Sequence, residues 1–232
     1  MNKIGIIGAM DEEVAGLKKE MNVTSTATIA SMEFLEGTLL GKEVVVVRSG
    51  IGKVNAAVCA EILAGIYKTD AIINTGIAGS LQTKIDIGDI VVSSDVLHHD
   101  MDATGFGYAL GQIPRMDVLS FPADNTLIQV AQEVCQQVNP EIHTHVGRVV
   151  SGDQFISDKQ LKEKITSNFQ GYCTEMEGAA IAQTAYLNQI PFVILRAISD
   201  KADDSATMDY PTFEKKAIEH CVNLVKGMIV RL

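Results

Sequence analysis

Acidic residues occur in three separated parts of this chain. Asp11-Glu12-Glu13 comes after the apolar run over residues 4–8, and Asp200 closes the run over residues 192–199. Between them, Thr174-Glu175-Met176-Glu177 opens a segment with helical spacing. Carboxyl groups can both protonate a leaving group and activate water when a glycosidic bond is broken. A fold that gathers the three groups would therefore form an acidic cleft capable of that chemistry.

Each acidic group also has a purely structural interpretation. Thr174-x-x-Glu177 fits a capping box, in which the glutamate satisfies a helix N-terminus. Asp11-Glu12-Glu13 could instead favour the positive end of a helix dipole. Ser199-Asp200 could be a strand-to-loop turn. Which interpretation holds depends on where the helices and strands place these residues.

Short apolar runs alternate with helical patterns along the chain. We expect strands over residues 4–8, 43–48, 71–74, 89–93, 146–150 and 192–199, and helices over 12–21, 54–67, 125–137, 177–188 and 211–232. Near-continuous apolar strands between helices are typical of a sheet covered on both faces. With no linker or repeat in view, the sequence predicts an α/β fold in one domain, residues 1–232.

The acidic groups all fall just after predicted strands. In open α/β sheets, ligands bind outside the carboxyl ends of the strands. Glu13, the Thr75-Gly76 turn, Glu175–Glu177 and Asp200 are therefore expected along one edge of the sheet. Their shared position favours a common site over independent structural roles.

The longest irregular stretch covers residues 98–124. A loop of that length in a compact domain is usually functional, as a lid or as a subunit contact. It carries the apolar residues Phe106, Tyr108, Ile113 and Pro114, which favour subunit packing. The sequence therefore predicts a homodimer.

Composition excludes several classes of function. The 232 residues carry a net charge of −10, which repels phosphate backbones, so nucleic acid is not an expected partner. The four cysteines, Cys59, Cys135, Cys173 and Cys221, form no C-x-x-C pair and lie in apolar stretches, which favours free thiols in a reducing compartment. Neither a signal peptide nor a membrane span is recognisable. A cytoplasmic protein is expected.

Other motifs fit alternative chemistries poorly. Gly5-Ile6-Ile7-Gly8 lacks the G-x-G-x-x-G spacing of dinucleotide sites, and glutamates follow it. In His98-His99-Asp100-x-Asp102, adjacent histidines on a strand point to opposite faces, so a structural role is preferred. His143-Thr144-His145 could share a face, but has no acidic or cysteine ligand pattern nearby in the sequence. Ser151-Gly152-Asp153 is not a nucleophile elbow. No metal is expected.

A set of motifs covers nearly the whole chain in order. They are Ile4-Gly5-Ile6-Ile7-Gly8-Ala9-Met10, Ser49-Gly50-Ile51-Gly52-Lys53-Val54-Asn55-Ala56-Ala57, Asn74-Thr75-Gly76, Ser151-Gly152-Asp153-Gln154-Phe155-Ile156, Glu175-Met176-Glu177 and Arg196-Ala197-Ile198-Ser199-Asp200. In these motifs the chain resembles the bacterial 5′-methylthioadenosine/S-adenosylhomocysteine nucleosidases of the nucleoside phosphorylase superfamily. No single motif is decisive, whereas the ordered set is specific.

The resemblance implies both a fold and a reaction. The fold is a three-layer α-β-α sandwich around a central twisted mixed β-sheet. The reaction is hydrolysis of the adenine–ribose bond of 5′-methylthioadenosine and S-adenosylhomocysteine, and also of 5′-deoxyadenosine. Adenine and a 5-thio-substituted ribose are released, as in methionine salvage and methyl-cycle recycling. The implied partners are these small nucleosides, and no cofactor is implied.

The resemblance also implies roles for individual residues. Asp200 would be the general acid at adenine N7, and Glu13 would activate the attacking water. Met176 and Glu177 would hold the ribose, with Glu177 bonding its hydroxyls. Phe155 would stack on adenine.

Further positions would line the substrate or support the acids. Backbone groups of Ile156 would read the adenine edge, and Ser199 and Arg196 would orient Asp200 and its neighbours. The other implied substrate-binding positions are Ala9, Met10, Ile51, Ile77, Ala78, Gly79, Glu175 and Tyr210, with Met10, Ile51 and Tyr210 on the sulfur side. Ala103, Phe106, Tyr108 and Pro114 would line the pocket across the dimer interface.

Two alternatives remain open at this point. A purine nucleoside phosphorylase of the same superfamily would need cationic or backbone donors for phosphate. The first predicted strand ends in acidic residues without an arginine, which favours water. Ile77 departs from relatives that carry a hydroxyl residue after Asn-Thr-Gly, which leaves the positioning of water open. The second alternative is a non-catalytic nucleoside-binding protein, against which Glu13, Glu177 and Asp200 together argue.

Overall fold

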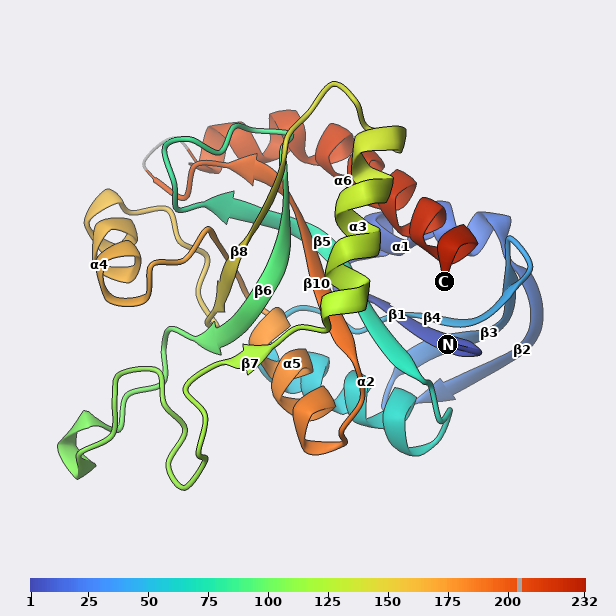
Figure 1. Cartoon of the computed structure of the whole chain (residues 1–232), viewed down its shortest axis with the longest axis horizontal. Helices are drawn as coiled ribbons and strands as arrows, with labels where there is room; N and C mark the ends of the chain where they lie inside the picture. The colour runs from blue at the N-terminus through green and yellow to red at the C-terminus, as the bar shows by residue number, and fades with distance from the viewer. Residues whose placement is uncertain (204–205) are drawn as a thin grey trace.

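The strands of the protein form one mixed sheet. A computed structural model describes residues 1–203 and 206–232, and its strands follow the order β10-β6-β8-β9-β5-β1-β4-β3-β2, with β7 paired to β6 (Figure 1). Parallel pairing joins β1 (Lys3–Gly8) to β4 (Lys42–Arg48) and β5 (Ala71–Ser80), and joins β5 to β10 (Phe192–Asp200). These four strands therefore present their carboxyl ends at the same edge.

Five of the strands close a ring of pairings. β10 pairs with β5 and also, antiparallel, with β6 (Ile90–His98), which pairs with β8 (Thr144–Ser151). The three-residue β9 (Cys173–Glu175) then joins β8 back to β5. Part of the sheet is therefore curled on itself rather than open.

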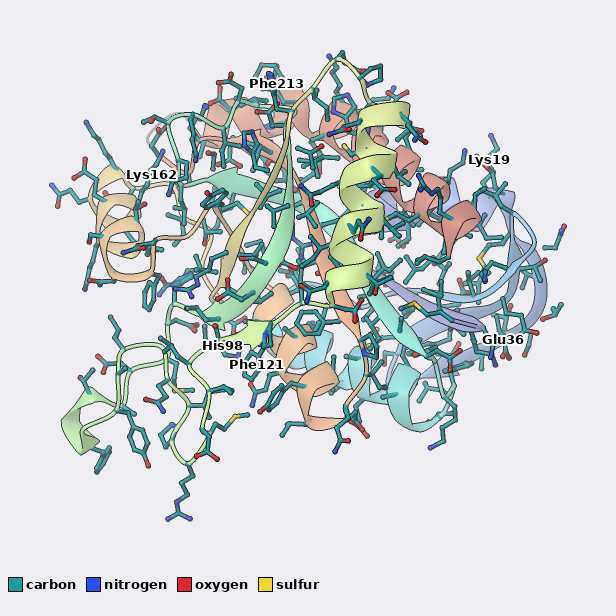
Figure 2. The ribbon with its side chains drawn as sticks, in the orientation of Figure 1. Lys19, Glu36, His98, Phe121, Lys162 and Phe213 are labelled. Atoms are coloured by element: carbon teal, nitrogen blue, oxygen red, sulfur yellow. The ribbon has the colours of Figure 1, made fainter. Side chains whose placement is uncertain are left out.

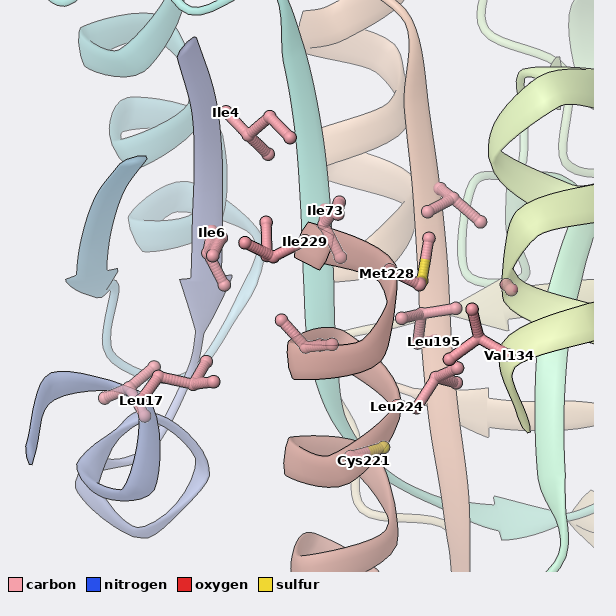
Figure 3. Packing of buried hydrophobic residues seen from close by; sticks show 14 of the residues in the cluster. Ile4, Ile6, Leu17, Ile73, Val134, Leu195, Cys221, Leu224, Met228 and Ile229 are labelled. Atoms are coloured by element: carbon pink, nitrogen blue, oxygen red, sulfur yellow. The ribbon is translucent and has the colours of Figure 1, made fainter. Parts of the chain in front are cut away.

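Helices cover both faces of this sheet, which confirms the predicted α/β sandwich. α1 (Asp11–Glu20), α3 (Asn125–Val138) and α6 (Ala206–Arg231) lie on one face, and α2 (Lys53–Gly65) and α5 (Gly178–Leu187) on the other. On the first face, the helices pack against the strands through a continuous aliphatic core, part of which Figure 3 shows: Ile4, Ile6, Leu17, Ile73, Val134, Leu195, Cys221, Leu224, Met228 and Ile229. A dense core of this kind fixes the strand ends relative to one another.

Several elements were not predicted. The hairpin of β2 (Asn22–Ile29) and β3 (Met32–Leu39) extends the sheet beyond β4. Most of β2 is exposed, so it lacks the apolar alternation that marks a half-buried strand. α4 (Lys159–Phe169) was also missed, and it packs a small separate core.

Three predicted bounds were wrong. β5 runs to Ser80, so Thr75-Gly76 lies inside a strand instead of a turn. The strand predicted over residues 89–93 continues to His98. α6 begins at Ala206, so Pro211, which was predicted to be its first residue, lies inside the helix.

The long loop was correctly predicted. Between β6 and α3 the chain forms only the short 3₁₀ turn η1 (Thr104–Phe106) and the two-residue strand β7 (Phe121–Pro122). This segment projects from the body of the molecule (Figure 1), and the Phe106 side chain is 86% exposed. His98 and Phe121 pack edge to face at its base (Figure 2). Within the described residues, no helix has the length and apolar character needed to cross a bilayer.

Candidate active site

A pocket of about 490 Å³ opens where the carboxyl ends of β1, β5 and β10 meet β9. It is lined by Ala9, Met10, Glu13, Ile51, Ile77, Ala78, Gly79, Gln154, Phe155, Ile156, Thr174, Glu175, Met176, Glu177, Ser199, Asp200, Tyr210 and Pro211. The structure thus brings all the acidic groups that the sequence singled out to one edge. β9 reaches this edge although it runs antiparallel to β5, because it is short and pairs with the very end of that strand.

Glu13 lies in the first turn of α1, buried beneath the pocket. Its Oε2 accepts hydrogen bonds from the N–H groups of Ala9 (2.7 Å) and Met10 (3.0 Å), and its Oε1 accepts one from Ile77 (3.2 Å). Burial raises the pKa of this carboxyl, although the Arg196 guanidinium and the three amides oppose that rise. Glu13 is therefore held in one orientation, with its basicity increased.

Asp200 ends β10 and is buried against the end of β5. The Ser199 hydroxyl donates to its Oδ2 (2.9 Å), and the Ala202 N–H donates to its Oδ1 (2.7 Å). Burial raises the pKa of Asp200, the two hydrogen bonds lower it, and nearby Asp209 and Asp203 raise it further. The net rise favours a protonated carboxyl that can act as an acid.

Glu175 lines the pocket and belongs to a buried network of polar side chains. Its carboxylate pairs with the guanidinium of Arg196 and accepts the Ser151 hydroxyl, and Arg196 also donates to Asn74 Oδ1 (2.6 Å). Burial raises the pKa of Glu175, but the Arg196 charge and these hydrogen bonds outweigh burial and hold it below its usual value. Arg196 does not line the pocket, and its hydrogen bonds orient Glu175 and not Asp200, which corrects the expected role.

The structural alternative of a capping box from Thr174 to Glu177 is wrong. Glu177 is the N-cap residue and its side chain makes no cap bond. The first amides of the helix are satisfied by Glu175 Oε2, which accepts from Glu177 N–H (3.2 Å) and Gly178 N–H (2.8 Å), and by Ser151 Oγ, which accepts from Ala179 N–H (2.7 Å). The side chain of Glu177 is thereby left for the pocket.

Glu177 is instead bonded by a distant backbone group. Its Oε1 accepts the N–H of Gly52 (2.8 Å), which precedes α2. Burial is the largest cause that raises the pKa of Glu177, and the negative charge of Glu175 adds to it. The two neighbouring glutamates thus have opposite pKa shifts, because Arg196 pairs with only one of them.

Aromatic and apolar side chains form the outer part of the pocket. Phe155 and Tyr210 meet edge to face, with ring centroids 5.9 Å apart and planes at 89°. Tyr210 Oη lies 3.4 Å from Met10 Sδ and donates to Glu214 Oε1 (3.0 Å). Phe155 is 50% exposed, which leaves an aromatic face accessible to a planar ligand.

The residues that line the pocket differ in part from those that the sequence predicted. Of the expected substrate positions, all but Arg196 line the pocket. Gln154, Thr174 and Pro211 line it and were missed, although each adjoins a predicted residue in the sequence. The four residues expected from a partner subunit, Ala103, Phe106, Tyr108 and Pro114, do not line the pocket that the described residues of their own chain form.

The histidine motifs lie outside the pocket. His98 Nε2 contacts Gln183 Oε1 (3.0 Å), as expected for a structural residue. His143 and His145 do have an acidic neighbour, Asp89, which β6 brings beside β8 and which the sequence did not reveal. Over residues 1–203 and 206–232, no group of three or more ligating side chains has a geometry suited to a metal ion.

Comparison with known proteins places this geometry in a family. The family model described as the phosphorylase superfamily matches residues 3–230. A 5′-methylthioadenosine/S-adenosylhomocysteine nucleosidase of Halalkalibacterium halodurans is 45% identical, with both chains fully covered, and one of Staphylococcus aureus is 44% identical over 99% of this chain and all of the relative.

Solved structures agree with this placement. The Neisseria meningitidis nucleosidase of the same name, in complex with methylthio-immucillin-A, has a TM-score of 0.96 and 36% identity, with both chains fully covered. A futalosine hydrolase of Helicobacter pylori has a TM-score of 0.93 and 31% identity, covering all of this chain and 98% of the other. The chain therefore belongs to the phosphorylase superfamily and, within it, to the family of 5′-methylthioadenosine/S-adenosylhomocysteine nucleosidases.

Proposed function

We propose that this protein hydrolyses the N-glycosidic bond of 5′-methylthioadenosine and S-adenosylhomocysteine, and also of 5′-deoxyadenosine. The products are adenine and the 5-substituted ribose. The observation that carries the proposal is one pocket in which Glu13, Glu177 and Asp200 meet an aromatic and apolar outer wall. Full-length relatives with this activity in their names support it.

Asp200 is the proposed general acid. Adenine is a poor leaving group as an anion, so its N7 must gain a proton as the bond breaks. A free aspartic acid has a pKa near ~3.9 and would be ionised at neutral pH. Burial raises the pKa of Asp200, and Ser199 fixes the direction of the carboxyl. Acid catalysis of this kind contributes roughly 10²–10⁴-fold in rate.

Glu13 is the proposed base that activates water. Its carboxylate is anchored by three amides, which leave lone pairs to accept a proton from water at the ribose carbon. As the glycosidic bond lengthens, the ribose becomes positively charged. The carboxylates of the pocket stabilise that charge in the transition state.

The remaining contacts would orient the nucleoside. Phe155 stacks on adenine and the backbone of Ile156 reads its edge, while Met176 and Glu177 hold the ribose. Met10, Ile51 and Tyr210 form a mostly apolar wall suited to a thioether. These assignments rest on the family motifs and on the position of each residue in the pocket.

Water is favoured over phosphate as the nucleophile. Phosphate binding calls for cationic side chains or several free amides. Among the described residues that line the pocket, none is Lys or Arg. Arg48, at the end of β4, pairs with Asp11 outside it.

An adenine-release assay in phosphate-free buffer tests the proposal. We expect release from 5′-methylthioadenosine, S-adenosylhomocysteine and 5′-deoxyadenosine without added phosphate. Adenosine and inosine serve as comparison substrates. A requirement for phosphate would instead indicate a phosphorylase, and binding of the nucleosides without release would indicate a non-catalytic protein.

We further propose a cytoplasmic homodimer in which the loop after β6 lines the partner's pocket through Ala103, Phe106, Tyr108 and Pro114. The exposure of Phe106 supports this arrangement, and so do Val54 and Val58 on the exposed side of α2. The four buried free cysteines agree with a reducing compartment.

A further inference from the structure

The position of the Glu177 carboxylate depends on the start of helix α2. Its Oε1 accepts the N–H of Gly52, the N-cap residue of that helix. Gly52 has a φ of 97°, which favours glycine, and a Cβ at this site would lie 3.2 Å from Asp153 Oδ1. Any movement of this helix end would therefore move the partner of Glu177.

The N-terminus of α2 is held by residues from other segments of the chain. α2 has no acidic residue in its first turn and no side-chain cap of its own. The N–H of Lys53, its first residue, donates to Asp153 Oδ1 (2.8 Å) from the loop after β8. Two carboxylates from other segments, Asp153 and Glu177, thus occupy the positive end of the helix dipole.

Asp153 is in turn fixed by a third segment. Its N–H donates to Asp100 Oδ2 (3.0 Å), and the Lys53 ammonium contacts both oxygens of Asp100 (2.6 and 2.8 Å). Lys53, Asp100 and Asp153 therefore form a closed ring of interactions, referred to below as the clamp. The clamp joins α2, the loop after β6 and the loop after β8.

The clamp lies outside the pocket, and its ion pair is partly shielded from solvent, whereas Asp153 is exposed. The Lys53 and Asp100 side chains are 21% and 20% exposed, so their ion pair is screened less than one in open water. Burial raises the pKa of Asp100, but Lys53 and the Asp153 amide outweigh it and leave the pKa below its usual range. None of the three residues is among those that line the pocket. They can act on a substrate only through other groups.

We propose that Lys53, Asp100 and Asp153 are positioning residues that hold the Glu177 carboxylate where it meets the ribose hydroxyls. The inference rests on the proposed function, because it assigns Glu177 to the ribose. Asp100 also begins the loop that carries Phe106, so the clamp links the segment proposed for subunit contact to the ribose-binding carboxylate. Opening the clamp should weaken recognition of the ribose more than recognition of the base.

Lys53→Met is the principal variant, because it keeps an unbranched side chain only one atom shorter and removes the charge. Lys53→Arg should restore the ion pair with Asp100. Lys3→Met is a matched control: Lys3 pairs with Glu36 at 2.6 Å, with side chains 27% and 32% exposed. Glu36 lies on β3, at the far side of the molecule from the base of the long loop at His98 (Figure 2).

The readout is kcat/KM for 5′-methylthioadenosine and for its 2′,3′-dideoxy counterpart. We expect Lys53→Met to lower the value for the parent nucleoside roughly 10- to 100-fold, as for a displaced positioning group. The dideoxy substrate, which has no hydroxyls for Glu177, should lose less than about 3-fold. Lys53→Arg should recover most of the loss, and Lys3→Met should leave both values unchanged.

A second variant covers the case in which Lys53→Met folds poorly. Asp100→Asn keeps an acceptor for the Asp153 amide but removes the ion pair. It should show the same selective loss at an unchanged melting temperature. Equal losses on the two nucleosides, or none, in both variants would overturn the inference. The wild-type protein tests the proposed function separately. If it releases no adenine from either nucleoside, the proposed function is wrong, whatever the variants do.

Discussion

At the scale of single residues, environment gives the pocket acids different properties. In the part of the chain that the structure describes, Glu13, Glu177 and Asp200 are buried without a side-chain cation bonded to them, and burial raises the pKa of each. Glu175, buried equally well, pairs with Arg196 and has a lowered pKa. Burial thus raises the proton affinity of Glu13, Glu177 and Asp200, whereas pairing with Arg196 keeps Glu175 ionised.

Asp200→Asn should nearly abolish adenine release. Asparagine keeps the shape and can still accept the Ala202 amide, but it cannot transfer a proton to adenine. We expect kcat to fall by at least roughly 10²–10⁴-fold. The measurement is adenine release, with nucleoside affinity by calorimetry as the control for an intact pocket. Turnover close to that of the wild type would remove Asp200 from the role of acid.

Activity should also depend on pH through the raised pKa of Asp200. The acid must be protonated, so kcat should decline as the pH rises through that pKa. Asp200→Glu, if it retains turnover, should shift the alkaline limb, whereas Ser199→Ala should raise the pKa of Asp200 by removing a hydrogen bond to the ionised form. A pH–rate profile of kcat checks this, and an alkaline limb unmoved in both variants would contradict the assignment.

Glu177→Gln should increase stability while it impairs activity. A buried carboxyl with a raised pKa costs folding free energy once it ionises, about 1.4 kcal/mol for each tenfold gain in its proton affinity on folding. Glutamine still offers an oxygen to the Gly52 N–H and carries no charge. The gain in melting temperature should therefore be absent below about pH 4, the unfolded value, and grow as the pH rises.

Glu175→Gln provides the opposite case. The folded pKa of Glu175 is lowered, so its contribution to stability is present above the unfolded pKa and lost on acidification. Leaving Arg196 buried without its partner should cost about 3–5 kcal/mol at neutral pH. Melting curves at pH 4 and pH 8 compare the two variants. Shifts of the same sign for both at pH 8 would contradict the assigned electrostatics.

At the scale of elements, close backbone approach shapes the pocket. β5 carries Gly76 directly over Glu13: an added Cβ would lie 2.5 Å from Glu13 Oε1 and 3.2 Å from an Arg196 nitrogen. Its φ is not in the left-handed region, so space and not backbone conformation requires glycine here. The glycine in Asn74-Thr75-Gly76 is therefore explained by the carboxylate that packs against it.

Gly76→Ala should displace Glu13 and impair catalysis more than folding. A shift of about 1 Å in a catalytic group can cost roughly 10²-fold in rate. Adenine release and thermal melting should be measured on the same preparation. Gly65→Ala in α2 is the control, because its Cβ would meet only the flexible end of Glu61 at 3.2 Å. Full activity of Gly76→Ala would show that Glu13 has room to move without consequence.

At the scale of the whole molecule, the curled sheet and the long loop determine what surrounds the pocket. The ring of β5, β9, β8, β6 and β10 brings Glu175 and Glu177 opposite the ends of the parallel strands. The loop after β6 leaves the body of the molecule with Phe106 exposed. Its apolar residues are the basis of the proposed dimer.

Light scattering at micromolar concentration should give the mass of a dimer. Phe106→Glu places a charge on the proposed interface, so it should shift the protein toward monomer and reduce adenine release in proportion. Val230→Glu is the control, because Val230 is exposed at the far end of α6, away from the loop. A monomeric wild type with full activity would contradict the proposed assembly.

The sequence by itself determined the α/β class, the buried strands and the family. Short, nearly continuous apolar runs predicted β1, β4 and β10. A strand that is buried on both faces shows such a run, because it has no polar residues at alternate positions. It missed the exposed β2, and three-residue β9 is too short for a periodic signal. The ordered motifs identified the family, which the comparisons confirm.

Only the tertiary structure decided what each carboxylate can do. In the sequence, Glu175 and Glu177 are two glutamates either side of a methionine, and nothing local distinguishes them. The fold places Arg196 and Ser151 against the first and the Gly52 amide against the second. Charge pairing and burial act across residues that lie 21 to 125 positions apart, so their balance could not be read from spacing. For the same reason the sequence did not show that Glu175 caps α5, which leaves the Glu177 side chain for the pocket.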